Sequence, residues 1–223
     1  MGLADNLARV RERIARGAER ASRAPAAVTV VAVTKGQPVA TIRALWELGL
    51  RDFGENRVQE ALTKVDALRQ PLRWHLIGPL QVNKINKVLP WVHMIQSVDS
   101  LKLARALSQR AERLGVTLPV LLEVKTSSEA SKHGFDPHAA EDAWGEVASL
   151  PCVEPRGLMT IAPFTREESE LRRSFRTLRH LHDGLQSVQP APSILSMGMS
   201  DDLEIAIEEG SNMVRVGRAL VAP

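Results

Sequence analysis

The fold is decided by the stretch Val28-Thr29-Val30-Val31-Ala32-Val33-Thr34-Lys35-Gly36. This run of β-branched and small apolar residues is typical of a strand that is buried on both faces in a parallel sheet. Lys35 follows the strand at its carboxyl end, where α/β proteins bind their ligands. An amine at that place is well positioned to form an imine with an aldehyde. The alternative is that Lys35 only marks the point where the strand meets water.

The same alternation of strand and helix continues along the chain. Strands separated by single helices predict parallel pairing with right-handed crossovers. The expected strands are residues 28–34, a short strand or strand end at 51–56, 74–79, 93–98, 119–124, a strand within 153–161 that ends at 157–159, 193–197 and 213–216. Eight such units in 223 residues fit a closed (β/α)8 TIM-type barrel, and an open doubly wound sheet is the alternative. A capping box, Thr165-x-x-Glu168, is expected to open the helix that precedes the seventh strand.

The two ends of the chain complete this α/β prediction. Apolar residues from Leu3 to Ile14 repeat at helical spacing, so residues 3–23 are expected to form an extra N-terminal helix. We expect this helix to cover the seam between the last and first strands, because an eighth outer helix is expected to be missing or very short. No linker divides the chain, so a single domain is expected over residues 1–223.

The composition argues against several classes of protein. Hydrophobic residues make up 44% and charged residues 25%, and no apolar run is long enough to span a membrane. The net charge is only +3 and aromatic residues make up 4%, whereas a nucleic-acid surface calls for a basic stripe with aromatic platforms. We therefore expect neither a nucleic-acid nor a membrane partner. The single cysteine, Cys152, and the lack of a signal peptide predict a cytoplasmic protein, and the lack of a leftover apolar stripe predicts a monomer.

Chemistry on a barrel belongs to the loops that follow the strands. The last two strands end in glycine-containing loops, residues 198–200 and 215–218, and phosphate sites of barrels are often built there. Ser200 is expected at a helix N-terminus, where free N–H groups and a hydroxyl hold phosphate oxygens. Asp201 and Asp202 must then point away, because acids in the first turn already balance the helix dipole. The alternative is a well-capped helix without a ligand.

Lys35 and this phosphate site come together because the first, seventh and eighth strands are neighbours in a closed barrel. A lysine that faces a phosphate cradle suits a cofactor with an aldehyde at one end and a phosphate at the other. Pyridoxal 5'-phosphate (PLP), held as a Schiff base, is such a cofactor. Arg215 is the candidate partner of its pyridine nitrogen. An arginine stays protonated and leaves that nitrogen without a proton, which weakens the ring as an electron sink.

Six motifs carry a resemblance that covers nearly the whole chain. They are VAVTKGQP at 31–38, FGENRVQE at 53–60, WHLIGPLQVNK at 74–84, SSEASKHGF at 127–135, GLMTIAP at 157–163 and SMGMSDDLEIAIEEGSNMVRVG at 196–217. With these motifs the chain resembles the pyridoxal phosphate homeostasis protein family, also called the YggS or proline synthase co-transcribed family. That family is similar in fold to the barrel domain of bacterial alanine racemase.

The resemblance implies a role for each residue of the site. It implies PLP bound as a Schiff base on Lys35, ring contacts from Asn56 and an arginine, Arg215, at the pyridine nitrogen. It also implies that the phosphate is held around Met199, Ser200 and Gly217. Lys132 matches a family lysine that is implicated in handing the cofactor on.

Four departures from the family pattern leave Lys35 untouched. Gln37 stands where many members have a second lysine, and Lys125 replaces a frequent asparagine. Arg218 occupies a place usually given to threonine or a small residue, and residues 220–222 lack the usual phenylalanine-glycine. Arg218 either adds a charge-assisted contact to the phosphate or changes how the cofactor is released.

Three functions compete on this evidence: a PLP carrier that catalyses little, a racemase-like PLP enzyme, and a barrel that serves as a protein contact. A racemase needs a positioned acid or base on each face of its substrate. The alanine racemase that the chain resembles uses a tyrosine and a second domain, whereas this chain has no tyrosine. A pure contact protein leaves the lysine and the phosphate site unexplained. We therefore expect a non-catalytic protein of PLP homeostasis, with PLP-dependent apo-enzymes as possible partners.

The histidines have less specific roles in the sequence. His75 is expected to be a hydrogen-bonded lining residue, with a catalytic base as the alternative. His180 and His182 are two apart on a helix and face different directions, so no metal site is expected.

Overall fold

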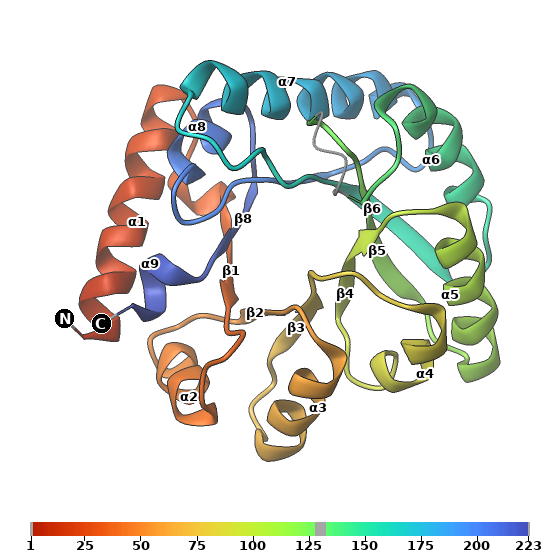
Figure 1. The fold of residues 1–223 in the computed structure, drawn as a ribbon, viewed down its shortest axis with the longest axis horizontal. Helices are drawn as coiled ribbons and strands as arrows, with labels where there is room; N and C mark the ends of the chain where they lie inside the picture. Colours follow the sequence, from red (N-terminus) through yellow and green to blue (C-terminus); the bar gives the residue numbers. More distant parts are fainter. Residues whose placement is uncertain (1, 128–132, 223) are drawn as a thin grey trace.

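The computed structural model describes residues 2–127 and 133–222, and its eight parallel strands close into a barrel (Figure 1). The strands follow one another in chain order: β1 Thr29–Val33, β2 Asp52–Glu55, β3 Arg73–Leu76, β4 Met94–Val98, β5 Leu118–Glu123, β6 Val153–Met159, β7 Ile194–Ser196 and β8 Met213–Val216. The barrel closes where β8 pairs with β1 in parallel, with Arg215 opposite Val31. The predicted (β/α)8 barrel is confirmed, and the alternative of an open sheet is wrong.

Helices cover the outside of the barrel between successive strands. In the described ranges they are α1 Leu3–Arg20, α2 Val39–Glu47, α3 Val58–Ala67, α4 Ile85–Val88, α5 Leu101–Leu114, α6 Ala140–Ala148, α7 Glu168–Gly184, α8 Leu203–Glu208 and α9 Arg218–Val221. The helix after β8, α9, has only 4 residues, so the prediction of a very short last helix is confirmed. The predicted capping box is wrong. The Thr165 hydroxyl accepts a hydrogen bond from the Glu167 N–H at 3.1 Å and closes a tight turn before α7 instead of capping it.

The N-terminal helix α1 packs where β8 meets β1. Its buried face, which includes Val10 and Ile14, belongs to one apolar cluster with residues of β1, α2, α8 and β8. Arg13 and Arg16 both form ion pairs with Glu204 of α8, at 3.1 and 3.0 Å. Figure 1 shows α1 alongside α8 and α9. The prediction that this helix covers the seam is confirmed.

Side chains alternate along each strand between the outer helices and the lumen of the barrel. One apolar cluster fills part of the lumen, and it consists of Val31, Met94, Leu121, Met159 and Met213. Several buried polar side chains also lie at strand positions that face the lumen. They are Asp52, His75, Gln96, Glu123, Ser196 and Arg215. The lumen is therefore a core of both apolar and polar side chains.

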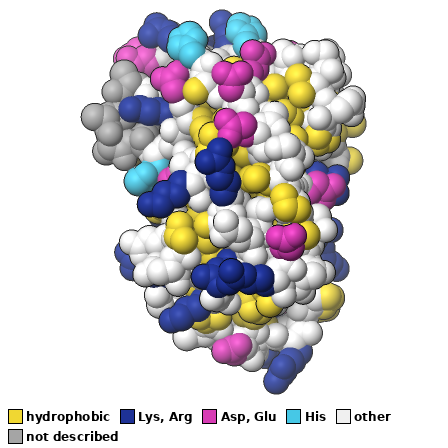
Figure 2. All heavy atoms as spheres, turned by 90° about the vertical axis from the view of Figure 1, so that its right-hand side faces the viewer, with side chains coloured by type: hydrophobic (Ala, Val, Ile, Leu, Met, Phe, Trp, Pro, Cys, Tyr) yellow, Lys and Arg dark blue, Asp and Glu magenta, His cyan; other side chains and the backbone are white. Residues whose placement is uncertain are grey.

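The outer surface carries charges of both signs. Figure 2 views the side of the molecule that lies at the right of Figure 1, and Lys and Arg side chains there are interspersed with acidic and hydrophobic ones. On this face the cations do not gather into one stripe. None of the helices in residues 2–127 and 133–222 is both long and apolar enough to cross a bilayer.

Candidate functional site

Lys35 lies in the turn that follows β1. The strand ends at Val33, Thr34 is buried and Lys35 is exposed. Side chains two residues apart on a strand point the same way, and Lys35 is four residues after Val31, which faces the lumen. Lys35 is therefore expected to point toward the lumen at the mouth of the barrel, the end where the strands finish. Gly36 adopts a φ of +72°, which L side chains disfavour, and this lets the chain turn away directly after the lysine. Within the described chain, no hydrogen bond or ion pair engages the Lys35 amine.

A buried lysine on α3, Lys64, holds this turn from the outer side of the barrel. Its amine donates hydrogen bonds to the Thr34 carbonyl oxygen at 2.7 Å, to Glu55 Oε1 at 2.7 Å and to Glu60 Oε1 at 2.6 Å. The Thr34 hydroxyl also donates to Glu55 at 2.6 Å, and the Gly36 N–H donates to Glu60. Burial raises the pKa of Glu55 above its ordinary value despite these hydrogen bonds. The network therefore anchors both residues that flank the candidate lysine.

Arg215 lies buried in the lumen on β8. Its Nη1 donates to the Ser196 hydroxyl at 2.6 Å and its Nη2 to the Thr160 carbonyl oxygen at 2.7 Å. Burial lowers the pKa of Arg215 to about 10, so the guanidinium still carries its charge at neutral pH. Because Arg215 pairs opposite Val31 on the strand that leads to Lys35, the two predicted cations lie on neighbouring strands.

The loop after β7 differs from the phosphate site that the sequence predicts. Ser200 is not at a helix N-terminus, because α8 begins at Leu203 with Asp202 as its N-cap residue. The Asp202 carboxylate points into the loop and accepts a hydrogen bond from the Met199 N–H at 2.5 Å. A short acidic side chain competes in this way for backbone N–H groups of a tight turn. The Ser200 hydroxyl instead accepts from the Ala219 N–H at 3.2 Å, which aims it at the start of α9.

Gly217 completes the predicted phosphate region from the β8 side. It is the N-cap residue of α9, and a Cβ added there would lie 3.4 Å from the Val33 side chain of β1. Arg218 forms an ion pair with Asp201, and both side chains are exposed. Asp201 therefore points away from the loop as expected, whereas Asp202 does not. The Asp202 carboxylate therefore occupies the Met199 N–H, which a phosphate could contact only after displacing it.

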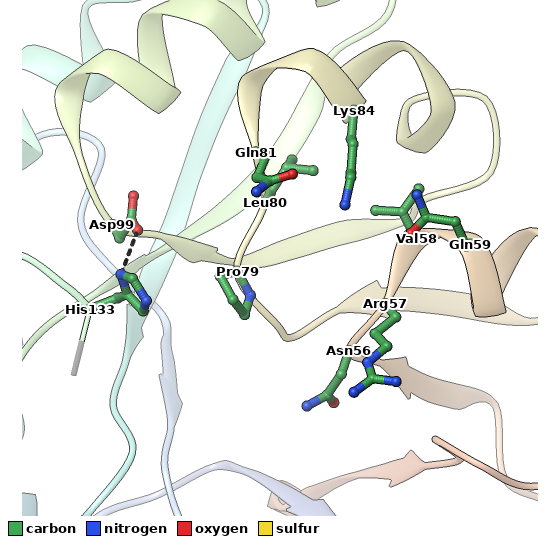
Figure 3. Close-up of a pocket in the computed structure, with 10 residues that line it drawn as sticks. All are labelled: Asn56, Arg57, Val58, Gln59, Pro79, Leu80, Gln81, Lys84, Asp99 and His133. Carbon is green, nitrogen blue, oxygen red and sulfur yellow. Dashed lines mark ion pairs between the residues drawn. The ribbon is translucent and has the colours of Figure 1, made fainter. Parts of the chain in front are cut away.

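Asn56 follows β2 at the rim of the barrel, beside a cavity of about 610 Å³ (Figure 3). Its side-chain oxygen Oδ1 is buried and has no hydrogen-bond partner in the part of the chain that the structure describes. A buried acceptor without a donor is costly, so this oxygen is available to accept a hydrogen bond from a water or from a ligand. Arg57 and Lys84 line the same cavity, and His133 pairs with Asp99 at 3.7 Å.

Glu123, at the end of β5, is a lumen acid that the sequence analysis missed. Burial and the nearby Asp99 carboxylate raise the pKa of Glu123 to about 7, against the opposing effects of Arg215 and His133. In the sequence it could be found as the one acid in an apolar strand, two residues after Leu121, which faces the lumen. The mouth therefore contains a carboxyl group that titrates near neutral pH.

His75 and Lys132 are two further residues that the sequence singled out. His75 is buried, and its ring nitrogens lie 3.0 Å from Asp52 and 2.9 Å from Gln96, so the hydrogen-bonded lining histidine is confirmed. Lys132 lies outside the described residues. Among the residues that are described, no three His, Cys, Asp or Glu side chains gather to hold a metal ion.

By their chemistry, three residues suit functional groups of PLP. The amine of Lys35 suits an aldehyde, the guanidinium of Arg215 suits a ring nitrogen, and the unpaired Asn56 oxygen suits a ring hydroxyl. The phosphate end fits less completely, because Asp202 occupies one of the expected N–H donors.

Known proteins match nearly the whole chain. The family model described as "Alanine racemase, N-terminal domain" matches residues 5–222. The chain is 40% identical over 222 residues to the "Pyridoxal phosphate homeostasis protein" of Aquifex aeolicus, which covers 99% of this chain and 97% of the relative. It is 43% identical over 219 residues to the protein of the same name from Pseudomonas aeruginosa, with 98% and 94% covered.

A solved structure has the same fold at a similar level of identity. PipY of Synechococcus elongatus, solved with PLP bound, has a TM-score of 0.86 and 37% identity over 98% of this chain and 99% of that chain. The same protein solved without PLP has a TM-score of 0.88. The chain therefore belongs to the pyridoxal phosphate homeostasis protein family.

Proposed function

We propose that this chain binds PLP as a Schiff base on Lys35 and holds it for storage, buffering or delivery rather than for catalysis. The observation that carries the proposal is the closure of the barrel by β8 and β1. This pairing sets the buried guanidinium of Arg215 beside the strand that leads to the free amine of Lys35. PipY, a relative with 37% identity, was solved with PLP bound, which supports the same ligand for this chain.

Each residue of the site has one task in this proposal. Lys35 Nζ forms a C=N bond to the aldehyde carbon, and the aldehyde oxygen leaves as water. Asn56 Oδ1 accepts a hydrogen bond from the ring hydroxyl, and Arg215 donates one to the ring nitrogen. The Ser200 hydroxyl and the backbone N–H of Gly217 hold the phosphate, and the Met199 N–H joins them only when the Asp202 carboxylate moves away from it.

The weak catalysis that we propose follows from Arg215 and from the missing tyrosine. Because the pKa of Arg215 is about 10, it keeps its proton at neutral pH and does not protonate the ring nitrogen. An unprotonated ring withdraws electrons less strongly. The chain also has no tyrosine to act as a second acid or base. PLP-dependent apo-enzymes are then the recipients of the cofactor, and a cytoplasmic, monomeric carrier remains the expectation from the sequence.

Reduction with borohydride tests the attachment site. Purified protein is incubated with PLP, its visible spectrum is recorded, and the reduced protein is digested and mapped by mass spectrometry. We expect a visible band and the added pyridoxyl mass on the peptide that contains Lys35. Lys35→Ala should lose both, whereas Lys102→Ala, which removes an exposed lysine on α5, should keep both. A labelled peptide elsewhere, or a normal band in Lys35→Ala, contradicts the assignment.

An assay for racemisation separates the carrier from a racemase-like enzyme. PLP-loaded protein is incubated with single enantiomers of several amino acids, and the products are resolved by chiral chromatography. A carrier leaves each enantiomer unchanged over many hours. Turnover that Lys35→Ala abolishes would instead favour the enzyme.

A further inference from the structure

A continuous chain of hydrogen bonds crosses the lumen from Arg215 to Asp52. Arg215 Nη1 donates to Ser196 Oγ at 2.6 Å, and Ser196 Oγ donates to Gln96 Oε1 at 2.7 Å. Gln96 Nε2 lies 2.9 Å from His75 Nδ1, and His75 Nε2 lies 3.0 Å from Asp52 Oδ1. All five side chains are buried, and they come from β8, β7, β4, β3 and β2. We call this chain the lumen relay.

The two charged ends and the amide orientation of Gln96 together fix the direction of every hydrogen bond in the lumen relay. A guanidinium has only donors, and a carboxylate has only acceptors. The amide oxygen of Gln96 can only accept, so the Ser196 hydroxyl, which accepts from Arg215, donates its own hydrogen to it. The amide nitrogen of Gln96 then faces His75, whose Nδ1 must accept. The hydrogen of the imidazole therefore sits on Nε2 and is donated to Asp52.

Both ends keep their charge at neutral pH. Burial alone would raise the pKa of Asp52, but hydrogen bonds from His75 and Arg73 outweigh it and lower the pKa to about 2. Arg73 donates to the two oxygens of Asp52 at 2.8 and 2.5 Å. Burial lowers the pKa of Arg215 only to about 10. Arg215 therefore stays a donor and Asp52 stays an acceptor. We call the polarity of the lumen relay the direction in which each hydrogen is donated, which runs from Arg215 toward Asp52.

We propose that Ser196, Gln96 and His75 are positioning residues that hold the Arg215 guanidinium in one orientation at the base of the cofactor site. The inference rests on the proposed function, because the ligand that Arg215 meets is the ring nitrogen of PLP. In the described chain, Arg215 is anchored by Ser196 and by the Thr160 carbonyl oxygen. Loss of the Ser196 link leaves the guanidinium free to rotate about the remaining contact.

The first test uses the apo protein and needs no cofactor. Long-range ¹H–¹⁵N NMR spectra report which imidazole nitrogen carries hydrogen, and His75→Gln identifies the signals of His75. We expect the hydrogen on Nε2 and an unprotonated Nδ1. A hydrogen on Nδ1 would break the polarity of the lumen relay and overturn the proposal.

The second test breaks the relay next to Arg215. Ser196→Ala should raise the dissociation constant of PLP about tenfold, because a hydrogen bond to a charged group is lost. It should also shift the midpoint of the pH profile of the bound cofactor's visible band. Ser108→Ala is the matched control, since Ser108 is buried on α5 and its hydroxyl donates to the Pro151 carbonyl oxygen at 2.7 Å, away from the lumen. The control should change neither value.

Two further outcomes keep the tests decisive. Where Ser196→Ala does not fold, Gln96→Met removes the next link at similar volume and is expected to shift the same pH profile. Unchanged affinity and an unchanged profile in a folded variant would overturn the positioning role. Failure of the unchanged protein to bind PLP would refute the proposed function, whereas the position of the imidazole hydrogen would still decide whether the lumen relay has its proposed polarity.

Discussion

Glu123 is an acid whose charge the folded barrel disfavours, so its removal should stabilise the protein in a pH-dependent way. Its carboxyl group is buried at the mouth, where it faces Asp99 after β4, Arg215 on β8 and His133 after β5. Burial, then Asp99, raise its pKa from the ordinary 4.5 to about 7. We predict that Glu123→Gln is more stable than the unchanged apo protein above neutral pH.

The sign of the effect follows from proton binding. Between pH 4.5 and about 7, the folded state keeps the proton on Glu123 while the unfolded state has lost it. The stability of the unchanged protein therefore falls as the pH rises through this window, and the loss is complete above it. The gap between the two pKa values is worth about 3 kcal/mol at about 1.4 kcal/mol per pKa unit. Glutamine carries no charge at any pH, so the stability of Glu123→Gln does not fall in this pH window.

Urea unfolding of the apo protein at pH 5 and pH 8 measures the effect. We expect Glu123→Gln to exceed the unchanged protein by about 3 kcal/mol at pH 8 and by about 1 kcal/mol or less at pH 5. Glu112→Gln, at an exposed position on α5, is the matched control and should give the same small difference at both pH values. An equal difference at pH 5 and pH 8 for Glu123→Gln would refute the reasoning.

Two more predictions concern the turns that shape the mouth. Lys64→Met should destabilise the apo protein by about 3–5 kcal/mol, because it leaves the buried Glu55 carboxylate without its ion pair. Urea unfolding measures this loss of stability, and a loss below about 1 kcal/mol contradicts the prediction. Gly198→Ala should cost about 2 kcal/mol or more, because Gly198 has a φ of +93° and a Cβ there would lie 2.5 Å from the Ala206 Cβ. Gly145→Ala, in α6 with open space around the new Cβ, should instead be neutral or stabilising.

The barrel was predictable because its strands are short apolar segments with one helix between each pair. The run up to Lys35 predicts β1 by composition alone, and the helical spacing from Leu3 predicts α1 and its place at the seam. Local caps were harder to predict. Thr165 has the right spacing for a capping box, but its hydroxyl closes a turn before the helix, and spacing does not distinguish the two arrangements.

The sequence singles out some of the polar residues in and above the lumen, and the ones that it does not single out share one property. Lys35 and Arg215 end or interrupt apolar strands, so they stand out along the chain. Gln96, Ser196 and Glu123 also lie in buried strands, but a single polar residue in a strand does not show which partner it meets across a lumen. Ser196 bonds to Gln96, 100 residues away, and Glu123 faces Arg215, and only the closed barrel brings these distant pairs together.

The lumen relay also gives a physical reason why Arg215 is buried without a carboxylate in direct contact, as far as residues 2–127 and 133–222 show. Neutral acceptors, Ser196 Oγ and the Thr160 carbonyl oxygen, satisfy two of its N–H groups, which limits the cost of burial. The nearest carboxylate along the relay, that of Asp52, is three side chains away. A carboxylate in direct contact would occupy two donors of the guanidinium at once. Asp202 and Glu123 act on Arg215 through their charges, but among the described residues neither forms an ion pair with it, so the guanidinium keeps donors for a ligand.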